Sequence, residues 1–181
     1  QKAAKESGLC EEIFESHDEK PTNSFLYSLV MDTYTGGSYS TAPFLDMPLN
    51  HKIFLAQFDT IKKLADESSC VIVGRCADYA LEEYPNVVSV FISGNDEDKI
   101  KRLMDVYHLS ESKAKDAMIK TDKQRSSYYN YYSNKKWSDP RSYDLCINSS
   151  VTGPEGAVDV ILNFAKVKQA WRQKKSADAA K

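Results

Sequence analysis

The chain has 181 residues, of which 41% are hydrophobic and 28% charged, enough for one domain with an apolar core and short for two full-sized domains. Its 24 basic and 26 acidic residues give a net charge of −2, which argues against a globally basic nucleic-acid-binding protein. The longest apolar stretches, such as Val87–Ile92, are far shorter than the roughly 20 residues of a membrane-spanning helix. The first residue is Gln1, and the apolar run of a secretory signal does not follow it.

The cysteines and histidines show no metal-binding spacing. The four cysteines form no CxxC pair, and the three histidines are scattered rather than clustered as zinc ligands would be. Cys70 and Cys146 lie in apolar, strand-like runs, where a free thiol usually behaves as a small buried hydrophobic side chain. We therefore expect a reduced, cytoplasmic protein without a structural metal.

The N-terminal part of the chain begins with the pattern of a helix end. Residues 2–7 predict the last turns of a helix, and the Gly-, Pro- and Ser/Thr-rich residues 34–48 predict a surface loop. Apolar residues then recur at helical spacing from Leu49, which predicts an amphipathic helix to about Glu67.

Short apolar runs alternate with helical patterns in the rest of the chain. The expected strands are Cys70–Val73, Val87–Ile92 and Asp144–Ile147. The expected helices are Ala77–Tyr84, Glu97–Tyr107 with Asn95 or Asp96 as its cap, Glu111 to at least Arg125, and Pro154 to about Val167, before a polar tail. This alternation predicts an α/β fold with a parallel sheet, in which ligands bind at the carboxyl ends of the strands. Gly74-Arg75 and Ser93-Gly94 stand at such ends.

The run VIVGRCADY, residues 71–79, carries the most informative pattern. A buried strand would end at Gly74, and Arg75 would project from its carboxyl end, where a planar guanidinium can bind phosphate. Asp78, about one helical turn later, can orient Arg75 or accept hydrogen bonds from ligand hydroxyls. The alternative is a structural Arg–Asp pair that ties the strand to the helix.

Residues 113–141 form a basic segment on an otherwise acidic chain, with eight Lys or Arg and three Asp. Such a segment favours a polyanion such as nucleotide phosphate, although a solvated helix face is the alternative. Lys120, Asp122 and Arg125 fall within about two turns, and the i,i+3 spacing lets Asp122 hold the Arg125 guanidinium. Arg102, on the preceding helix, is a further candidate to face the same phosphates.

Residues 126–137, SSYYNYYSNKKW, place four tyrosines and Trp137 among lysines. Aromatic rings between cations can stack nucleic-acid bases, which would make the segment a groove for single-stranded RNA. They can equally form the packed hinge of a lid that closes over a nucleotide.

With VIVGRCADY, the helix ending KTDKQR at Arg125, the run YYNYY…KKW and the later YDLCINSS, the chain resembles the cytidylate kinase-like family of P-loop nucleoside monophosphate kinases. The resemblance covers roughly Gln1 to Phe164 and is most specific in GRCADY and in DxxR followed by tyrosines. It implies a three-layer α/β domain with a parallel sheet of about five strands. It also implies transfer of the γ-phosphoryl group of ATP, with Mg²⁺, to a nucleoside monophosphate, with CMP or dCMP as the first expectation.

The resemblance also implies residue roles. Arg75 would hold the phosphate of the acceptor, with Asp78 near the acceptor sugar or phosphate. In the better-known cytidylate kinases the acid directly follows this arginine, whereas Cys76 follows it here.

In the second half of the chain, the resemblance implies that Lys120 and Arg125 are lid cations that close on the phosphates, joined by Arg102. Asp122 is expected in the substrate-binding set beside Arg125. These roles suit phosphoryl transfer, which needs convergent positive charge more than covalent chemistry.

Kinases of this kind open with a strand, a glycine-rich phosphate loop and a helix, and the resemblance here begins only after that unit. We expect the native protein to carry roughly 25–35 additional N-terminal residues, whose strand would lie between those at 70–74 and 87–92. One domain is expected over residues 1–168, followed by a polar tail at 169–181. Within that domain we expect an acceptor-side region at 9–50 and a lid-like region at 110–141.

Two other functions remain open at this stage. A non-catalytic nucleotide-binding or regulatory module could keep the fold and lack phosphoryl transfer, and residues 126–137 could bind single-stranded RNA. We expect nucleoside monophosphate and ATP as ligands and no membrane association. A homo-oligomer, with the 34–48 loop as its contact, also remains open.

Overall fold

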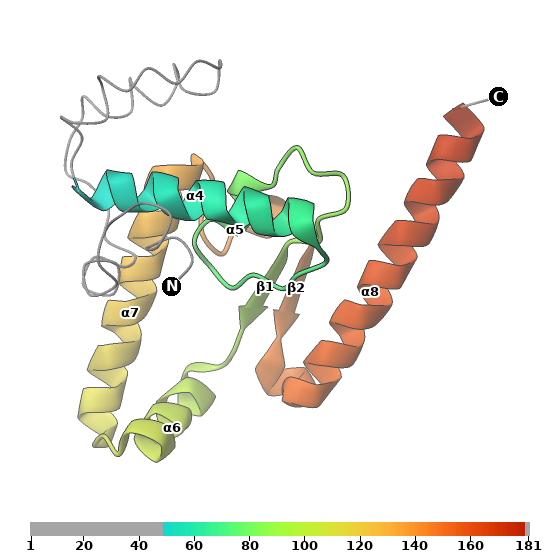
Figure 1. Ribbon diagram of the computed structural model, residues 1–181. Coiled ribbons are helices and arrows are strands. Elements are labelled where there is room, and N and C mark those ends of the chain that lie inside the picture. The colour runs from blue at the N-terminus through green and yellow to red at the C-terminus, as the bar shows by residue number, and fades with distance from the viewer. Residues whose placement is uncertain (1–48, 180–181) are drawn as a thin grey trace. The chain divides into compact units, whose positions relative to one another are not determined.

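The computed structural model describes residues 49–179, shown in colour in Figure 1. The expectations for residues 1–48, including the helix end at 2–7 and the loop at 34–48, lie outside the described residues. The chain divides into two compact units: Gln1–Leu81 with Ser127–Asn134, and Glu82–Ser126 with Lys135–Lys181. Each unit is described separately below.

Helix α4 (Leu49–Glu67) and the last turns of helix α7 (Glu111–Ser133) supply the apolar core of the first unit. Ile53, Phe54 and Ile61 of α4 are buried, as their helical spacing predicts. The Phe54 ring stacks on Tyr132 of α7, with ring centroids 4.0 Å apart and an interplanar angle of 11°. The predicted helix from Leu49 to Glu67 is therefore confirmed.

The predicted strand at Cys70–Val73 is wrong. These residues have no regular secondary structure, and the Val71 and Val73 side chains are 95% and 86% exposed. A strand becomes stable only when a neighbouring strand satisfies its backbone N–H and C=O groups, and none of residues 49–179 pairs with this run. The short helix that follows, α5, spans Ala77–Ala80, less than the predicted Ala77–Tyr84.

The second unit is built on two parallel strands, β1 (Val90–Ser93) and β2 (Leu145–Asn148). Val90 pairs with Leu145, and Ile92 with Ile147. Parallel strands need a long crossover, and α6 (Asp96–Tyr107), most of α7 and the 3-10 turn η1 (Pro140–Ser142) provide it. The strands and helices predicted in this region are confirmed, with strand bounds that shift by one to three residues.

Helix α8 (Ser149–Ala179) packs against both strands of this small sheet (Figure 1). Gly153 has a non-helical backbone, with φ 68° and ψ 167°, and the long straight part of α8 begins at Pro154, as predicted. The predicted end near Val167 is wrong, because the helix continues to Ala179. The tail is rich in Ala, Lys, Gln and Arg, which are strong helix formers.

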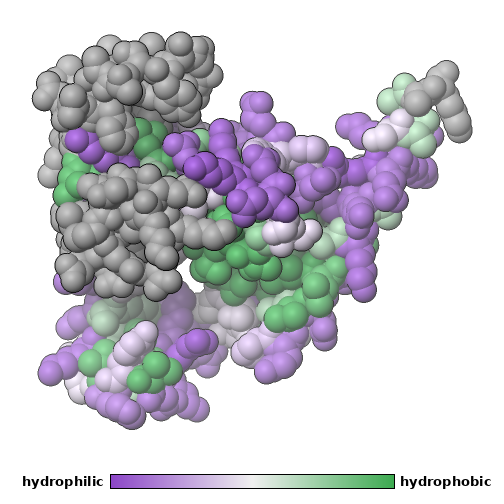
Figure 2. Space-filling view, in the orientation of Figure 1, coloured by the Kyte–Doolittle hydropathy of each residue, from purple (hydrophilic) through white to green (hydrophobic). Residues whose placement is uncertain are grey.

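The surface of the second unit carries apolar side chains as well as charged ones. Ile92 of β1 and five large apolar residues of α8 beyond Pro154 are exposed: Val158, Val160, Leu162, Val167 and Trp171. Figure 2 shows apolar surface gathered in the region of the sheet and α8. No helix within residues 49–179 is both long enough and apolar enough to span a membrane.

The cysteines of the described residues are all free thiols, but their burial differs from the prediction. Cys70 and Cys146 are exposed, whereas Cys76 is buried. Cys70 is exposed because its strand does not form. Cys146 is exposed although it lies within β2.

Candidate functional site

The turn that carries Arg75 has an unusual backbone. Gly74, Arg75 and Cys76 have φ values of 71°, 60° and 53°, so three successive residues adopt the left-handed conformation. For residues with a Cβ this conformation costs roughly 1–2 kcal/mol each, and such strain concentrates at ligand-binding turns. Arg75 is half-buried, and the Ala77 N–H closes the turn by donating to the Gly74 carbonyl at 3.1 Å.

Asp78 lies in α5, directly after this turn, and is held by the aromatic end of α7. The hydroxyl of the buried Tyr129 donates to Asp78 Oδ2 at 2.6 Å. The structure therefore gives the Asp78 carboxylate a protein partner that sequence spacing did not indicate.

Most of the aromatic side chains in residues 126–137 pack within the protein. Tyr128, Tyr129 and Tyr132 are buried, and Trp137 packs edge-on against Phe91 of β1 with ring centroids 5.2 Å apart. Buried rings cannot stack on nucleic-acid bases, so the packing of Tyr128, Tyr129 and Tyr132 disfavours the RNA-binding interpretation. The role of this segment as the hinge of a lid stays a prediction.

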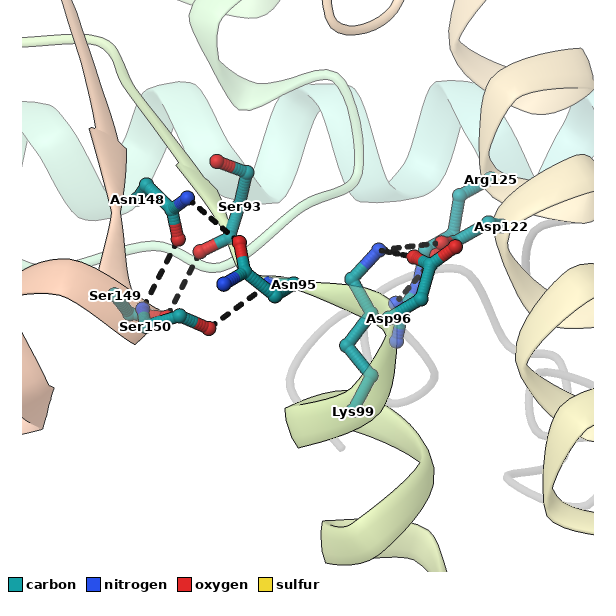
Figure 3. A network of polar contacts seen from close by, with 9 residues as sticks. All are labelled: Ser93, Asn95, Asp96, Lys99, Asp122, Arg125, Asn148, Ser149 and Ser150. Carbon is teal, nitrogen blue, oxygen red and sulfur yellow. Dashed lines mark hydrogen bonds and ion pairs between the residues drawn. The ribbon is translucent and has the colours of Figure 1, made fainter. Parts of the chain in front are cut away.

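The carboxyl ends of β1 and β2 carry a network of short polar side chains, drawn in Figure 3. Asn148 Nδ2 donates to Asn95 Oδ1 at 3.0 Å, and the Asn95 N–H donates to Ser150 Oγ at 2.8 Å. Ser149 Oγ donates to the Ser93 carbonyl at 2.8 Å. Asn95 occupies the predicted N-cap position of α6, but its side chain makes no capping bond and accepts from Asn148 instead.

A cluster of charges lies beside this network, between α6 and α7 (Figure 3). Arg125 Nη1 is 3.6 Å from Asp122 Oδ1, which confirms the predicted i,i+3 pair. Lys99 Nζ donates to Asp122 Oδ2 at 3.2 Å and is 3.7 Å from Asp96 Oδ1. Sequence reasoning missed Lys99, and the only local signal for it was its own i,i+3 spacing from Asp96.

The other two predicted cations, Lys120 and Arg102, are exposed on α7 and α6. Lys120 is exposed, and two residues along a helix turn it by about 200° from Asp122, so the two project from opposite sides of α7. Arg102 is exposed on α6, one turn after Lys99.

Two acidic residues outside this cluster, Asp139 and Asp144, have lowered pKa values. The Arg141 guanidinium donates to both carboxylate oxygens of Asp139, which lowers the pKa of Asp139 to about 2. Burial by itself would raise the pKa of Asp144, but hydrogen bonds from Lys168 and Ser89 hold it below its ordinary value. Asp144 lies at the amino end of β2, so we assign this pair of contacts to the fold rather than to a ligand site.

The model of the cytidylate kinase-like family matches residues 1–151 of the chain. The chain belongs to that family. Residues 1–151, which the family model matches, include all six residues singled out from the sequence: Arg75, Asp78, Arg102, Lys120, Asp122 and Arg125. The Asn and Ser residues at the carboxyl end of β2 lie there as well.

A solved structure with a similar fold is that of an uncharacterized protein from Eubacterium ventriosum, which is 39% identical. The similarity covers 65% of the present chain and 74% of the other, with a TM-score of 0.63. No curated protein matches the chain.

Proposed function

We propose that this member of the cytidylate kinase-like family is a nucleoside monophosphate kinase that transfers the γ-phosphoryl group of ATP to CMP or dCMP. The observation that carries the proposal is the family match, which spans every residue that the sequence singled out for phosphate binding. The strained Arg75 turn and the paired Asp122 and Arg125 support it. The fold that we propose for the whole protein is the three-layer P-loop kinase domain.

In the proposed reaction, a phosphate oxygen of the acceptor attacks the γ-phosphorus of ATP while the bond to the β,γ-bridging oxygen breaks, giving ADP and a nucleoside diphosphate. The protein contributes position and positive charge rather than a covalent intermediate. Arg75 binds the acceptor phosphate, with Asp78 fixing the acceptor side of that turn. Arg125, supported by Arg102 and Lys120, neutralises charge on the transferred group.

ATP brings Mg²⁺ with it in this proposal. Mg²⁺ in nucleotide-dependent enzymes is held largely by substrate phosphates and water. Within residues 49–179 no three His, Cys, Asp or Glu side chains lie together in a group that could bind a metal ion. Asp122 is paired with two cations, Lys99 and Arg125. We therefore assign the Asp122 carboxylate to holding these cations rather than to binding Mg²⁺.

An assay of ADP release tests the proposal on the full-length protein with ATP, Mg²⁺ and a panel of nucleoside monophosphates. We expect turnover to be fastest with CMP or dCMP. Measurable ATP binding without turnover for any acceptor would contradict the proposal and favour a non-catalytic nucleotide-binding module.

A further inference from the structure

The Asp122 carboxylate is shared between two cations that come from different helices. Its Oδ2 accepts from Lys99 Nζ at 3.2 Å, and its Oδ1 is 3.6 Å from Arg125 Nη1 (Figure 3). The Asp122 and Lys99 side chains are 29% and 35% exposed, whereas Arg125 is 52% exposed. Of the two cations, Arg125 is thus the more accessible and lies farther from the Asp122 carboxylate.

Lys99 lies near the start of α6, the helix that follows the carboxyl end of β1. Its backbone N–H makes the usual helical hydrogen bond to the Asn95 carbonyl at 3.1 Å, and the Asn95 N–H donates to Ser150 Oγ. The ion pair with Asp122 therefore ties α7 to the start of α6, close to the end of the sheet where ligands of parallel sheets bind.

A carboxylate with two cationic partners can release one of them at low cost. When Arg125 turns to a phosphate, Asp122 stays paired with Lys99. Without Lys99, the same movement would leave a partly buried carboxylate without a cation, which costs more than the pair itself is worth.

We propose that Lys99 is a positioning residue, which keeps Asp122 paired while Arg125 exchanges the Asp122 carboxylate for a nucleotide phosphate. This inference rests on the proposed function. Lys99 acts through Asp122 and Arg125 and is not itself required to touch the substrate.

Steady-state kinetics of the Lys99→Met variant, with CMP and ATP as substrates, tests the inference. We expect kcat to fall about three- to tenfold, the range that one partly exposed ion pair can supply, with the KM for CMP unchanged. Lys99→Arg retains the pair and should recover most of the loss. Lys101→Met, at an exposed lysine on the same helix, is the matched control and should behave as wild type.

A double variant separates this role from a merely structural one. In the Asp122→Asn background the carboxylate that Lys99 and Arg125 share is absent, so Lys99→Met should change kcat by less than about twofold. A full loss in that background would overturn the inference, and so would equal kinetics of Lys99→Met and Lys101→Met. Thermal melting of each variant shows whether it is folded.

The two proposals fail in different ways. Absence of turnover by the wild-type protein contradicts the proposed kinase, and the Kd for Mg-ATP by calorimetry then replaces kcat in the same set of variants. If Lys99→Met then had the same Kd for Mg-ATP as the wild type, that result alone would overturn the proposed role of Lys99.

Discussion

The Tyr129 hydroxyl donates a hydrogen bond to Asp78 Oδ2 at 2.6 Å, and this bond links the buried aromatic end of α7 to the helical turn that follows Arg75. The two residues lie 51 positions apart in the chain. The bond holds α5 directly behind three residues in the left-handed conformation, so the packing of α7 supports the strained turn.

Tyr129→Phe removes the hydroxyl and keeps the ring. We expect the free energy of unfolding to fall by about 1–3 kcal/mol, because a hydrogen bond to a charged group is lost and the half-buried carboxylate loses its donor. The KM for the nucleoside monophosphate should rise severalfold, because the Arg75 turn loses support. Urea unfolding and the ADP-release assay measure the two effects. Tyr107→Phe, at an exposed tyrosine of α6, is the control, and a Tyr129→Phe protein that matches it would contradict the prediction.

Substitution of Arg75 and of Arg125 should affect different kinetic constants. Arg75→Ala is expected to raise the KM for the acceptor on the order of 10- to 100-fold, because it removes the guanidinium of the proposed charge-assisted, bidentate phosphate contact. Arg125→Ala is expected mainly to lower kcat, by a similar factor, because in the proposed reaction its charge stabilises the transferred group. Steady-state kinetics with each substrate varied in turn measures both constants. If both variants kept wild-type kinetics, the assignment of these two arginines would be wrong.

The features predicted correctly from the sequence are the local ones. Helix α4 follows from the spacing of Ile53, Phe54 and Ile61, and the Asp122–Arg125 pair follows from an i,i+3 spacing within one helix. The run Cys70–Val73 has the apolar composition of a buried strand, but a strand also needs a partner, which composition does not reveal.

Contacts between segments far apart in the chain could not be predicted from the sequence. Lys99 and Asp122 are 23 residues apart, and each could have been read as an ordinary charge on a solvated helix face. The tyrosines of α7 illustrate the same limit, because their composition fits base stacking as well as core packing, and only their burial against α4 separates the two.

The stack of Phe54 on Tyr132 should dominate the stability of the first unit. Phe54→Ala is expected to lower the free energy of unfolding by about 3–5 kcal/mol, the usual range for a fully buried phenylalanine, since it leaves a cavity between α4 and α7. Phe58→Ala, on the same helix but only partly buried, should cost clearly less. Urea unfolding followed by circular dichroism compares the two, and equal losses would show that the core of this unit is not centred on Phe54.

His51 should make the protein less stable in mild acid. It is fully buried beside Phe54 and Tyr132, with ring centroids 5.8 and 5.6 Å away, and burial lowers the pKa of His51 from 6.5 to about 3. The unfolded chain therefore takes up a proton near pH 6.5, whereas the folded protein resists it until about pH 3. The stabilisation from the neutral ring is complete above pH 6.5 and is lost as the pH falls towards 3, by at most about 1.4 kcal/mol per pH unit.

Urea unfolding between pH 7 and pH 4 should show this slope in the wild type and in His108→Asn, which changes an exposed histidine. His51→Leu should flatten it, and an unchanged slope in that variant would assign the acid sensitivity to other groups.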